Sequence, residues 1–203
     1  MKIICVGRNY GAHAKELGNE VPDEPVIFLK PDSALLKDNK PFYLPDWSND
    51  IHYEAELVFK VSRNGKYISE AHAYKYVEEI TLGIDFTARD IQSKLKSKGL
   101  PWELAKGFDG SAVIGSFKKI SELRSKDEIG FSLQKNGETV QQAVSAEMIF
   151  PLAKLISFVS RYISLKQGDL IFTGTPQGVG QVAIGDELRG FLENEEVFAF
   201  KIK

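Results

Sequence analysis

Short apolar runs separated by turn-forming residues occur along the whole sequence, and this pattern constrains the fold more than any other feature. Strand-like runs outnumber helical stretches, and the two do not alternate in regular βαβ units. No segment repeats with a period of about 20 to 50 residues, which disfavours solenoids and propellers. The pattern predicts an α+β protein that is rich in β structure, with mostly antiparallel sheets. The predicted strands include Lys2–Val6, Val26–Leu29, Ile51–Val61, Ile80–Ile84 and a hairpin over Ile129–Ala143 about Asn136-Gly137.

Three segments carry clear helical signals. Pro151–Tyr162 has the apolar spacing of an amphipathic helix. Ser69 can cap a helix that runs to about Glu79. Thr87, with Asp90 three residues later, resembles a capping box at the start of another helix.

The composition is that of a globular protein with one core. Of the 203 residues, 43% are hydrophobic and 27% are charged, which is enough apolar material for one sizeable core. No Pro/Gly/Ser-rich linker and no low-complexity tract divides the sequence. We therefore expect one domain over residues 1–203.

The charge distribution excludes some classes of partner. The net charge is -2 and the acidic and basic residues are interspersed, so no basic footprint favours nucleic acid or a membrane surface. A small-molecule partner fits better. The first residues hold too few apolar side chains for a signal peptide or a membrane span, which predicts a cytoplasmic protein. Cys5 is the only cysteine, so any metal must be held by oxygen or imidazole ligands.

Two glutamates face the same way on the strand expected at Ile51–Val61. The period of two sends Glu54 and Glu56 to one face, about 7 Å apart. Hard cations such as Mg²⁺ or Mn²⁺ prefer oxygen ligands, so two carboxylates at this spacing could share one ion. A half-buried strand with glutamates on its wet side explains the same alternation, and alternation alone favours that interpretation.

Asp85 and Lys106 are further candidates for chemistry. Asp85 ends an apolar strand just before a helix, where a side chain is well placed for a site, although helix capping is equally open. Lys106 lies between Leu104-Ala105 and Gly107-Phe108, which is an unusual setting for an ammonium unless it faces a cleft. A solvent-facing loop lysine is the alternative.

His13 and Glu16 form a possible proton-transfer pair. Three residues apart on a helix, they share a face, and the carboxylate could orient the imidazole to take a proton from water. A surface pair without function is the alternative. Further along, the glycine-rich segment Gly174–Gly180 follows a predicted strand, and its backbone N–H groups could receive a carboxylate. Its glycine spacing is not that of a dinucleotide fingerprint.

The order and spacing of several motifs resemble the fumarylacetoacetate hydrolase family nearly from end to end. The closest resemblance is to its short single-domain branch, which includes acylpyruvate hydrolases and oxaloacetate decarboxylases. Each motif alone is a weak signal, but the ordered set is specific. The matching segments are Val6-Gly7-Arg8-Asn9-Tyr10, Phe28-Leu29-Lys30-Pro31, His52-Tyr53-Glu54-Ala55-Glu56-Leu57, Asp85-Phe86-Thr87-Ala88-Arg89-Asp90, Pro101-Trp102 with Ala105-Lys106, and Thr173-Gly174-Thr175-Pro176.

The resemblance implies a fold, an assembly and a set of functional residues. The fold would be a β-rich roll or pseudo-barrel with a few helices, in a homodimer, with the metal at the mouth of the roll. Glu54, Glu56 and Asp85 would bind Mg²⁺ or Mn²⁺. His13 and Glu16 would form a water-activating dyad on a mobile lid.

By the same resemblance, Lys106 would be a catalytic lysine near the substrate oxygens. Gly107 stands where many relatives carry serine, which leaves the substrate open. The implied substrate contacts are Arg8, Arg89, Gln92 and Thr175.

The implied reaction is metal-dependent hydrolysis of a C–C bond in a 3-acylpyruvate, which is a 2,4-dioxo acid. The substrate would chelate the metal, and His13, oriented by Glu16, would deprotonate a water that attacks the distal carbonyl. Pyruvate would leave as its enolate, stabilised by the metal and Lys106, with a carboxylic acid as co-product. Oxaloacetate decarboxylation and isomerisation or tautomerisation of a 2-hydroxy-2,4-diene-dioate remain alternatives. A non-catalytic binding protein is disfavoured because it has no need of the whole residue set.

Overall fold

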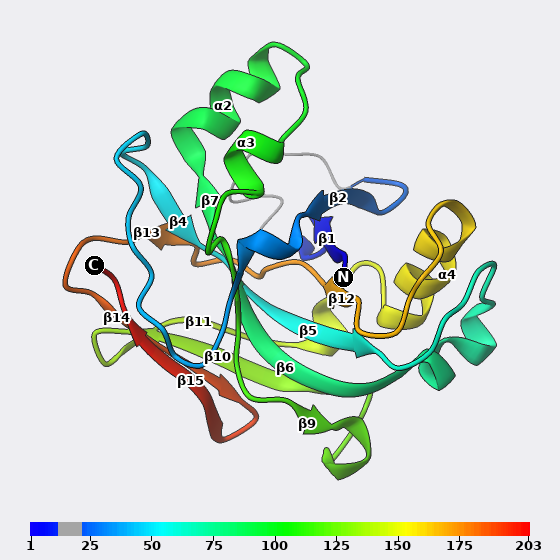
Figure 1. Cartoon of the computed structure of the whole chain (residues 1–203). Coiled ribbons are helices and arrows are strands. Elements are labelled where there is room, and N and C mark those ends of the chain that lie inside the picture. The colour runs from blue at the N-terminus through cyan, green and yellow to red at the C-terminus, as the bar shows by residue number, and fades with distance from the viewer. Residues whose placement is uncertain (12–21) are drawn as a thin grey trace.

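A large, curved sheet forms the centre of the molecule (Figure 1). The computed structural model describes residues 1–11 and 22–203 of the chain. The strands of this sheet are β1 (Ile3–Gly7), β2 (Val26–Lys30), β3 (Leu35–Leu36), β5 (Ala55–Val61), β6 (Val77–Asp85), β8 (Ala112–Ile114), β9 (Lys118–Lys119) and β12 (Leu170–Phe172). Their order is β2-β1-β12-β5-β6-β8-β3, and β9 also pairs with β6. Only β1 with β12 and β3 with β8 pair in parallel among these strands.

Two smaller sheets pack beside it. One has the order β11-β10-β14-β15 and the other β13-β4-β7, and all of their pairs are antiparallel. The strands of the first are β10 (Gly130–Lys135), β11 (Glu138–Val144), β14 (Glu187–Leu192) and β15 (Glu195–Lys201). The strands of the second are β4 (Ile51–Tyr53), β7 (Thr87–Ala88) and β13 (Gly180–Gln181).

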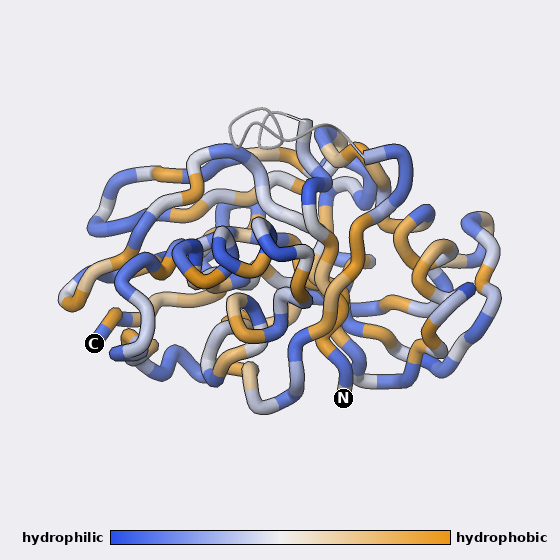
Figure 2. Tube along the Cα trace, turned by 90° about the horizontal axis from the view of Figure 1, so that it is seen from above, coloured by the Kyte–Doolittle hydropathy of each residue, from blue (hydrophilic) through white to orange (hydrophobic). Residues whose placement is uncertain are grey.

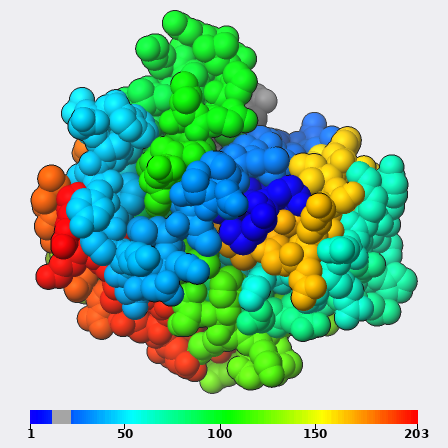
Figure 3. Space-filling model, in the orientation of Figure 1, coloured from blue at the N-terminus to red at the C-terminus, as the bar shows by residue number. Residues whose placement is uncertain are grey.

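The helices lie around these sheets. Figure 3 shows the segment that carries α2 and α3 standing out from the body of the molecule. No helix in residues 1–11 and 22–203 is long and apolar enough to cross a membrane. The helices of the described residues are α2 (Arg89–Ser97), α3 (Glu103–Lys106) and α4 (Leu152–Tyr162), with 3₁₀ turns at Asp32–Ala34, Glu70–Tyr76, Ile120–Glu122 and Ser145–Glu147.

One continuous apolar core joins the three sheets. Leu57 of β5, Leu82 of β6, Leu133 of β10 and Ile51 of β4 are all buried in the same cluster. Figure 2 shows hydrophobic stretches passing through the middle of the molecule and hydrophilic ones in the outer loops. Val58 of β5 belongs to a second apolar cluster, so β5, which carries part of the candidate site, is packed on both of its faces.

The predicted fold class is confirmed, and several local predictions with it. The structure is a mixed α and β fold in which strands dominate and most pairs are antiparallel. The hairpin turns at Asn136 and Gly137, whose φ angles of 54° and 85° are the left-handed values that a tight two-residue turn requires. The amphipathic helix runs over Leu152–Tyr162 with Pro151 as its N-cap residue.

Three local predictions were wrong in detail. The strand expected at Ile51–Val61 is divided at Glu54, because β4 pairs with β7 and β13 whereas β5 joins the large sheet. The helix expected after Ser69 is a 3₁₀ segment, and β6 already begins at Val77. Thr87 lies in β7 and does not cap α2, because its hydroxyl is used elsewhere.

Asp169, the residue before β12, links that strand to the start of the chain through Lys2. Its carboxylate accepts hydrogen bonds from Lys2 N at 2.8 Å, Lys2 Nζ at 2.5 Å and Lys166 N at 2.8 Å. Burial disfavours the ionised form, but these hydrogen bonds outweigh burial and lower the pKa of Asp169 below its ordinary value. The ionised carboxylate therefore stabilises the fold above about pH 4, and this contribution is lost as the pH falls through the lowered pKa.

We expect Asp169→Asn to lower the free energy of unfolding at pH 7 by about 1.5–3 kcal/mol, the range for hydrogen bonds to a charged group. Because the wild-type carboxylate also becomes protonated in acid, the difference between the two proteins should shrink below about pH 4. Urea unfolding at several pH values measures both quantities. Asp23→Asn, at an exposed position, is the control. An equal loss at every pH would contradict this account.

Candidate metal centre and active site

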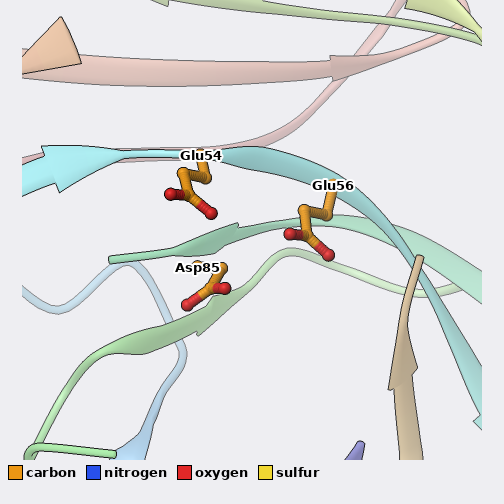
Figure 4. A group of neighbouring side chains, drawn as sticks. All are labelled: Glu54, Glu56 and Asp85. Atoms are coloured by element: carbon orange, nitrogen blue, oxygen red, sulfur yellow. The ribbon is translucent and has the colours of Figure 1, made fainter. Parts of the chain in front are cut away.

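Three carboxylates meet where β4, β5 and β6 come together. Glu54 occupies the break between β4 and β5, Glu56 lies in β5, and Asp85 ends β6. Figure 4 shows the three side chains turned toward one another. One oxygen from each lies within 4.8 Å of the others, and the residues are only 5%, 1% and 0% exposed. The antiparallel pairing of β5 with β6 brings them together, since Asp85 N donates to Glu54 O at 2.8 Å.

The alternation of apolar and polar residues in this strand had favoured a solvent-exposed face for the two glutamates, and that interpretation was wrong. Glu54 and Glu56 do point to the same side, as the period of two predicts. The side to which they point is covered by the rest of the fold, so β5 is buried on both faces over most of its length. Burying two like charges in this way requires compensating cations.

Cations from three elements meet the carboxylate cluster. Lys106 Nζ, on α3, lies 2.8 Å from Glu54 Oε2 and 2.6 Å from Asp85 Oδ2. Lys30 Nζ, at the end of β2, lies 2.5 Å from Asp85 Oδ1. The Arg89 guanidinium, at the start of α2, pairs with Glu54. Among the residues that the structure describes, Glu54 and Asp85 therefore each have two cationic neighbours.

Lys106 is not the solvent-facing lysine that was one interpretation of its sequence. It is 3% exposed and ends the short helix α3, whose direction brings the ammonium onto the carboxylate cluster. Burial disfavours its charge, but the carboxylates of Asp85 and Glu54 outweigh burial and raise the pKa of Lys106. The side chain is held as an ammonium.

Lys30 has no role in the sequence predictions, although its motif was part of the resemblance. Its side chain is fully buried, and besides its ion pair it donates to the backbone carbonyls of Phe86 at 3.1 Å and Ser111 at 2.8 Å. Burial lowers the pKa of Lys30, and the charge of Asp85 opposes this change. A lysine at the end of an apolar strand was the available signal, because a lysine is almost never fully buried without a partner.

Glu56 is held by the glycine-rich segment after β12. Gly174 N donates to Glu56 Oε2 at 2.7 Å. The glycine-rich segment therefore binds a carboxylate, as its backbone N–H groups suggested, but that carboxylate is a side chain of the protein itself. Gly174 has a φ of +94°, and a Cβ there would lie 2.7 Å from Asn9 Cβ, which accounts for glycine at this position. Burial, followed by the negative charges of Asp85 and Glu54, raises the pKa of Glu56.

The donor set fits a hard divalent cation. All three candidate ligands are carboxylate oxygens, which is the donor class that Mg²⁺ and Mn²⁺ prefer. Burial and the negative charges of Asp85 and Glu54 raise the pKa of Glu56, so the described surroundings favour its neutral form. A cation placed among these oxygens would favour the ionised form of that carboxylate.

A small cavity of about 40 Å³ opens onto the cluster. It has room for only a few water molecules, so a substrate requires side chains around it to move. Larger hollows exist elsewhere, such as one of about 510 Å³ beside β10 and β11, but the described residues contain no other group of carboxylates placed for a metal. The cavity is lined by Val6, Gly7, Arg8, Phe28, Glu54, Glu56, Asp85, Arg89, Gln92, Lys96, Trp102, Lys106 and Thr175.

All four predicted substrate contacts therefore lie around this cavity. Arg8 reaches it from the end of β1, with a left-handed backbone at φ 59°. Arg89 and Gln92 come from α2, where the guanidinium donates to Gln92 Oε1 at 2.9 Å. Thr175 comes from the segment after β12 and is 3% exposed. His13 and Glu16 lie outside the described residues.

Three positive side chains that line the cavity lie close enough for their charges to interact, and we call them the cationic rim: Arg8, Arg89 and Lys96. Burial and then the charges of Arg8 and Arg89 lower the pKa of Lys96, so the three cations repel one another. An anion between them would relieve this repulsion. The sequence predictions did not include Lys96, although its position seven residues, or two helical turns, after Arg89 was a usable signal.

Comparison with known proteins places this geometry in a family. The model of the fumarylacetoacetate (FAA) hydrolase C-terminal family matches residues 2–203. The chain is 40% identical over 201 residues to the mouse mitochondrial oxaloacetate tautomerase FAHD1, covering 99% of this chain and 91% of that protein. It is also 40% identical over 188 residues to the oxaloacetate tautomerase YcgM of Escherichia coli, covering 92% and 86%.

A solved structure of the same family has a similar fold. The fumarylpyruvate hydrolase of Pseudomonas aeruginosa, in complex with Mn²⁺ and pyruvate, superposes with a TM-score of 0.94 at 35% identity, over 100% of this chain and 89% of that one. The relatives include mitochondrial and bacterial proteins, so the cytoplasmic location stays a prediction. Likeness in sequence and in fold thus extends from one end of the chain to the other, and the chain belongs to the fumarylacetoacetate hydrolase family.

Proposed function

We propose that residues 1–203 form one catalytic domain, which uses a divalent metal to act on small 2-oxo dicarboxylates and tautomerises oxaloacetate between its keto and enol forms. The observation that carries this proposal is one cavity that joins a carboxylate cluster to the cationic rim. Oxaloacetate has a 2-oxo acid at one end and a second carboxylate at the other. A metal held by the carboxylate cluster would bind the 2-oxo acid end, and the cationic rim would bind the second carboxylate.

The relatives support the same reaction. Two proteins that are 40% identical to this chain over most of their length are oxaloacetate tautomerases. The fumarylpyruvate hydrolase of similar fold contains Mn²⁺ and pyruvate, which is itself a 2-oxo acid. The homodimer expected from the family resemblance stays a prediction.

Glu54, Glu56 and Asp85 are the proposed metal ligands. Bound there, Mg²⁺ or Mn²⁺ would supply Lewis acidity that polarises the 2-oxo group. Lys106 would donate hydrogen bonds to the oxygen at C2, where negative charge develops when a proton leaves C3. The ammonium is suitably placed, since it lies 2.6 Å and 2.8 Å from two of the carboxylates.

The remaining task is to orient the substrate and move one proton. The cationic rim would hold the distal carboxylate and so set the position of C3. Tautomerisation removes a proton from C3 and adds one to the oxygen at C2, or the reverse. His13 with Glu16 stays the predicted pair that carries the C3 proton.

Hydrolysis of the C–C bond of an acylpyruvate is the second candidate. The fumarylpyruvate hydrolase likeness favours it, and so does the presence of both His13 and Glu16 in the sequence. In that reaction the same pair would deprotonate a water rather than carry the C3 proton. The cationic rim would select an acylpyruvate that ends in a carboxylate.

Tautomerase activity can be measured by the decay of the ultraviolet absorbance of enol-oxaloacetate. We expect the protein with Mg²⁺ or Mn²⁺ to accelerate this decay, EDTA to stop it, and no pyruvate to appear beyond the uncatalysed rate. Pyruvate release from oxaloacetate would establish a decarboxylase instead. Release from acetylpyruvate or fumarylpyruvate would establish a hydrolase, and no effect on any of these substrates would overturn the proposal.

The role of the cationic rim is tested separately. We expect Lys96→Gln to raise the KM for oxaloacetate by about two- to fivefold, because an exposed charge pair contributes only modestly. The effect should shrink as the salt concentration rises. Lys94→Gln removes an exposed charge from the same helix outside the cavity lining and should leave the KM unchanged. Equal effects of the two substitutions would contradict a specific rim.

A further inference from the structure

Gln141 is a buried polar side chain that reaches the active site from another sheet. It lies in β11, is 2% exposed, and does not line the cavity itself. Its amide contacts Ala55, which stands between the proposed ligands Glu54 and Glu56, and also contacts the Thr175 segment. A buried amide that is placed between two parts of one site is suited to positioning them.

The orientation of this amide follows from its partners. Ala55 N lies 2.9 Å from Gln141 Oε1. A backbone N–H can only donate, so this atom of the side chain must be the oxygen. The other atom is then the nitrogen, Nε2, which donates to Pro176 O at 2.9 Å. A carbonyl oxygen can only accept, which agrees with the same assignment.

The contact with Thr175 therefore has a fixed direction. Gln141 Nε2 lies 2.9 Å from Thr175 Oγ1, and an amide nitrogen cannot accept a hydrogen bond. Thr175 Oγ1 is the acceptor in this pair, so its own proton must point elsewhere. Because Thr175 lines the cavity, the hydroxyl is available as a donor to a bound molecule.

The segment that carries Thr175 is also held closely against β11. Gly178 has a φ of +93°, and a Cβ there would lie 2.3 Å from Val140 O. The backbones thus approach more closely than any other residue allows. The position of the Thr175 hydroxyl is consequently set by β11 as well as by the segment after β12 that carries it.

We propose that Gln141 is a positioning residue that commits Thr175 to donate a hydrogen bond to a substrate oxygen. The site would thereby select a carboxylate or carbonyl oxygen next to the carboxylate cluster and reject a group that can only donate. Gly174, the residue before Thr175, holds Glu56, so the oxygen in question belongs to the 2-oxo-acid end of the substrate. The identity of that substrate rests on the proposed function, but the direction of the hydrogen bond does not.

The test uses oxalate, an unreactive probe of the 2-oxo-acid end, titrated calorimetrically into the Mg²⁺-loaded full chain. Gln141→Met removes the amide donor, so the Thr175 hydroxyl is no longer held as an acceptor on the β11 side and can turn. We expect oxalate to bind about tenfold or more weakly. Thr175→Val should weaken binding to a similar extent, whereas Thr175→Ser, which keeps the hydroxyl, should bind as the wild type does.

The double variant separates positioning from a merely structural role. If Gln141 acts through the hydroxyl, Gln141→Met combined with Thr175→Val should bind oxalate no more weakly than Thr175→Val alone. Effects that multiply, or wild-type binding by Gln141→Met, would overturn the proposal. Gln142→Met, at the exposed neighbouring position, is the matched control.

A second variant covers the case in which Gln141→Met does not fold. Gln141→Glu keeps an oxygen for Ala55 N but replaces the donor with an acceptor, which would draw the Thr175 proton away from the cavity. The same loss of oxalate binding is expected, and the KM for oxaloacetate should rise in parallel. If the protein does not turn over oxaloacetate but the oxalate pattern holds, the proposed function fails and this inference stands.

Discussion

Glu56→Gln is expected to lower oxaloacetate turnover by more than about 100-fold and to weaken Mn²⁺ binding by at least that factor, since even residues that only orient metal ligands contribute about 10- to 100-fold. The substitution replaces one proposed ligand oxygen by an amide and removes one negative charge. The fold should persist, because an amide oxygen can accept the hydrogen bond from Gly174 N that the carboxylate accepts now. Electron paramagnetic resonance of free Mn²⁺ measures binding independently of turnover.

Glu79→Gln is the matched control for this experiment. Glu79 lies in β6, the strand that pairs with the Glu56 strand, but its side chain is 39% exposed and pairs with Lys60. It should leave turnover and Mn²⁺ binding unchanged. If Glu56→Gln bound Mn²⁺ as tightly as the wild type, Glu56 would not be a ligand.

Asp85→Ala is expected to lower the free energy of unfolding of the metal-free protein by about 3–5 kcal/mol, because it leaves buried charges without their partner. The Lys30 side chain is 0% exposed and lies 2.5 Å from the lost carboxylate. Lys106 loses a contact of 2.6 Å but keeps Glu54. Lys30 should therefore account for much of the cost.

Adding Lys30→Met should recover part of this stability, so that the double variant is more stable than Asp85→Ala alone. The coupling between the two positions is expected to be about 0.5–3 kcal/mol. Urea unfolding of the wild type, both single variants and the double variant in EDTA measures it. The exposed pair of Lys60 and Glu79 provides the comparison, with an expected coupling below about 1 kcal/mol. Strictly additive losses at Lys30 and Asp85 would show that their contact does not stabilise the fold.

Local signals in the sequence predicted elements whose conformation depends on a few neighbouring residues. The Asn136-Gly137 turn and the helix ending at Tyr162 are of this kind. The prediction for Thr87 failed for the opposite reason. Its spacing to Asp90 suits a capping box, but its hydroxyl donates to Glu54 Oε1 at 2.9 Å, and a residue 33 positions away has no influence on a local pattern.

In the candidate site, too, some features could be predicted from neighbouring residues and others depended on distant parts of the chain. Alternation predicted that Glu54 and Glu56 share a face, and the family resemblance connected them with Asp85 and Lys106. Whether that face is wet or buried depends on what packs over it, so alternation alone favoured the wrong answer. His13 and Glu16 stay a prediction from the resemblance.

By itself, then, the sequence determined which side chains could take part in chemistry and which of them share a strand face, because strand periodicity and turn conformation are properties of adjacent residues. Only the tertiary structure decided what those side chains meet. Lys30 reaches Ser111 O across 81 positions, and Gln141 reaches Ala55 N across 86. Contacts between residues so far apart in the sequence arise from the pairing and packing of whole strands, which no local pattern encodes. The physical reason is that the fold around a residue sets its burial and its hydrogen-bond partners, whereas its position along a strand sets the face to which its side chain points.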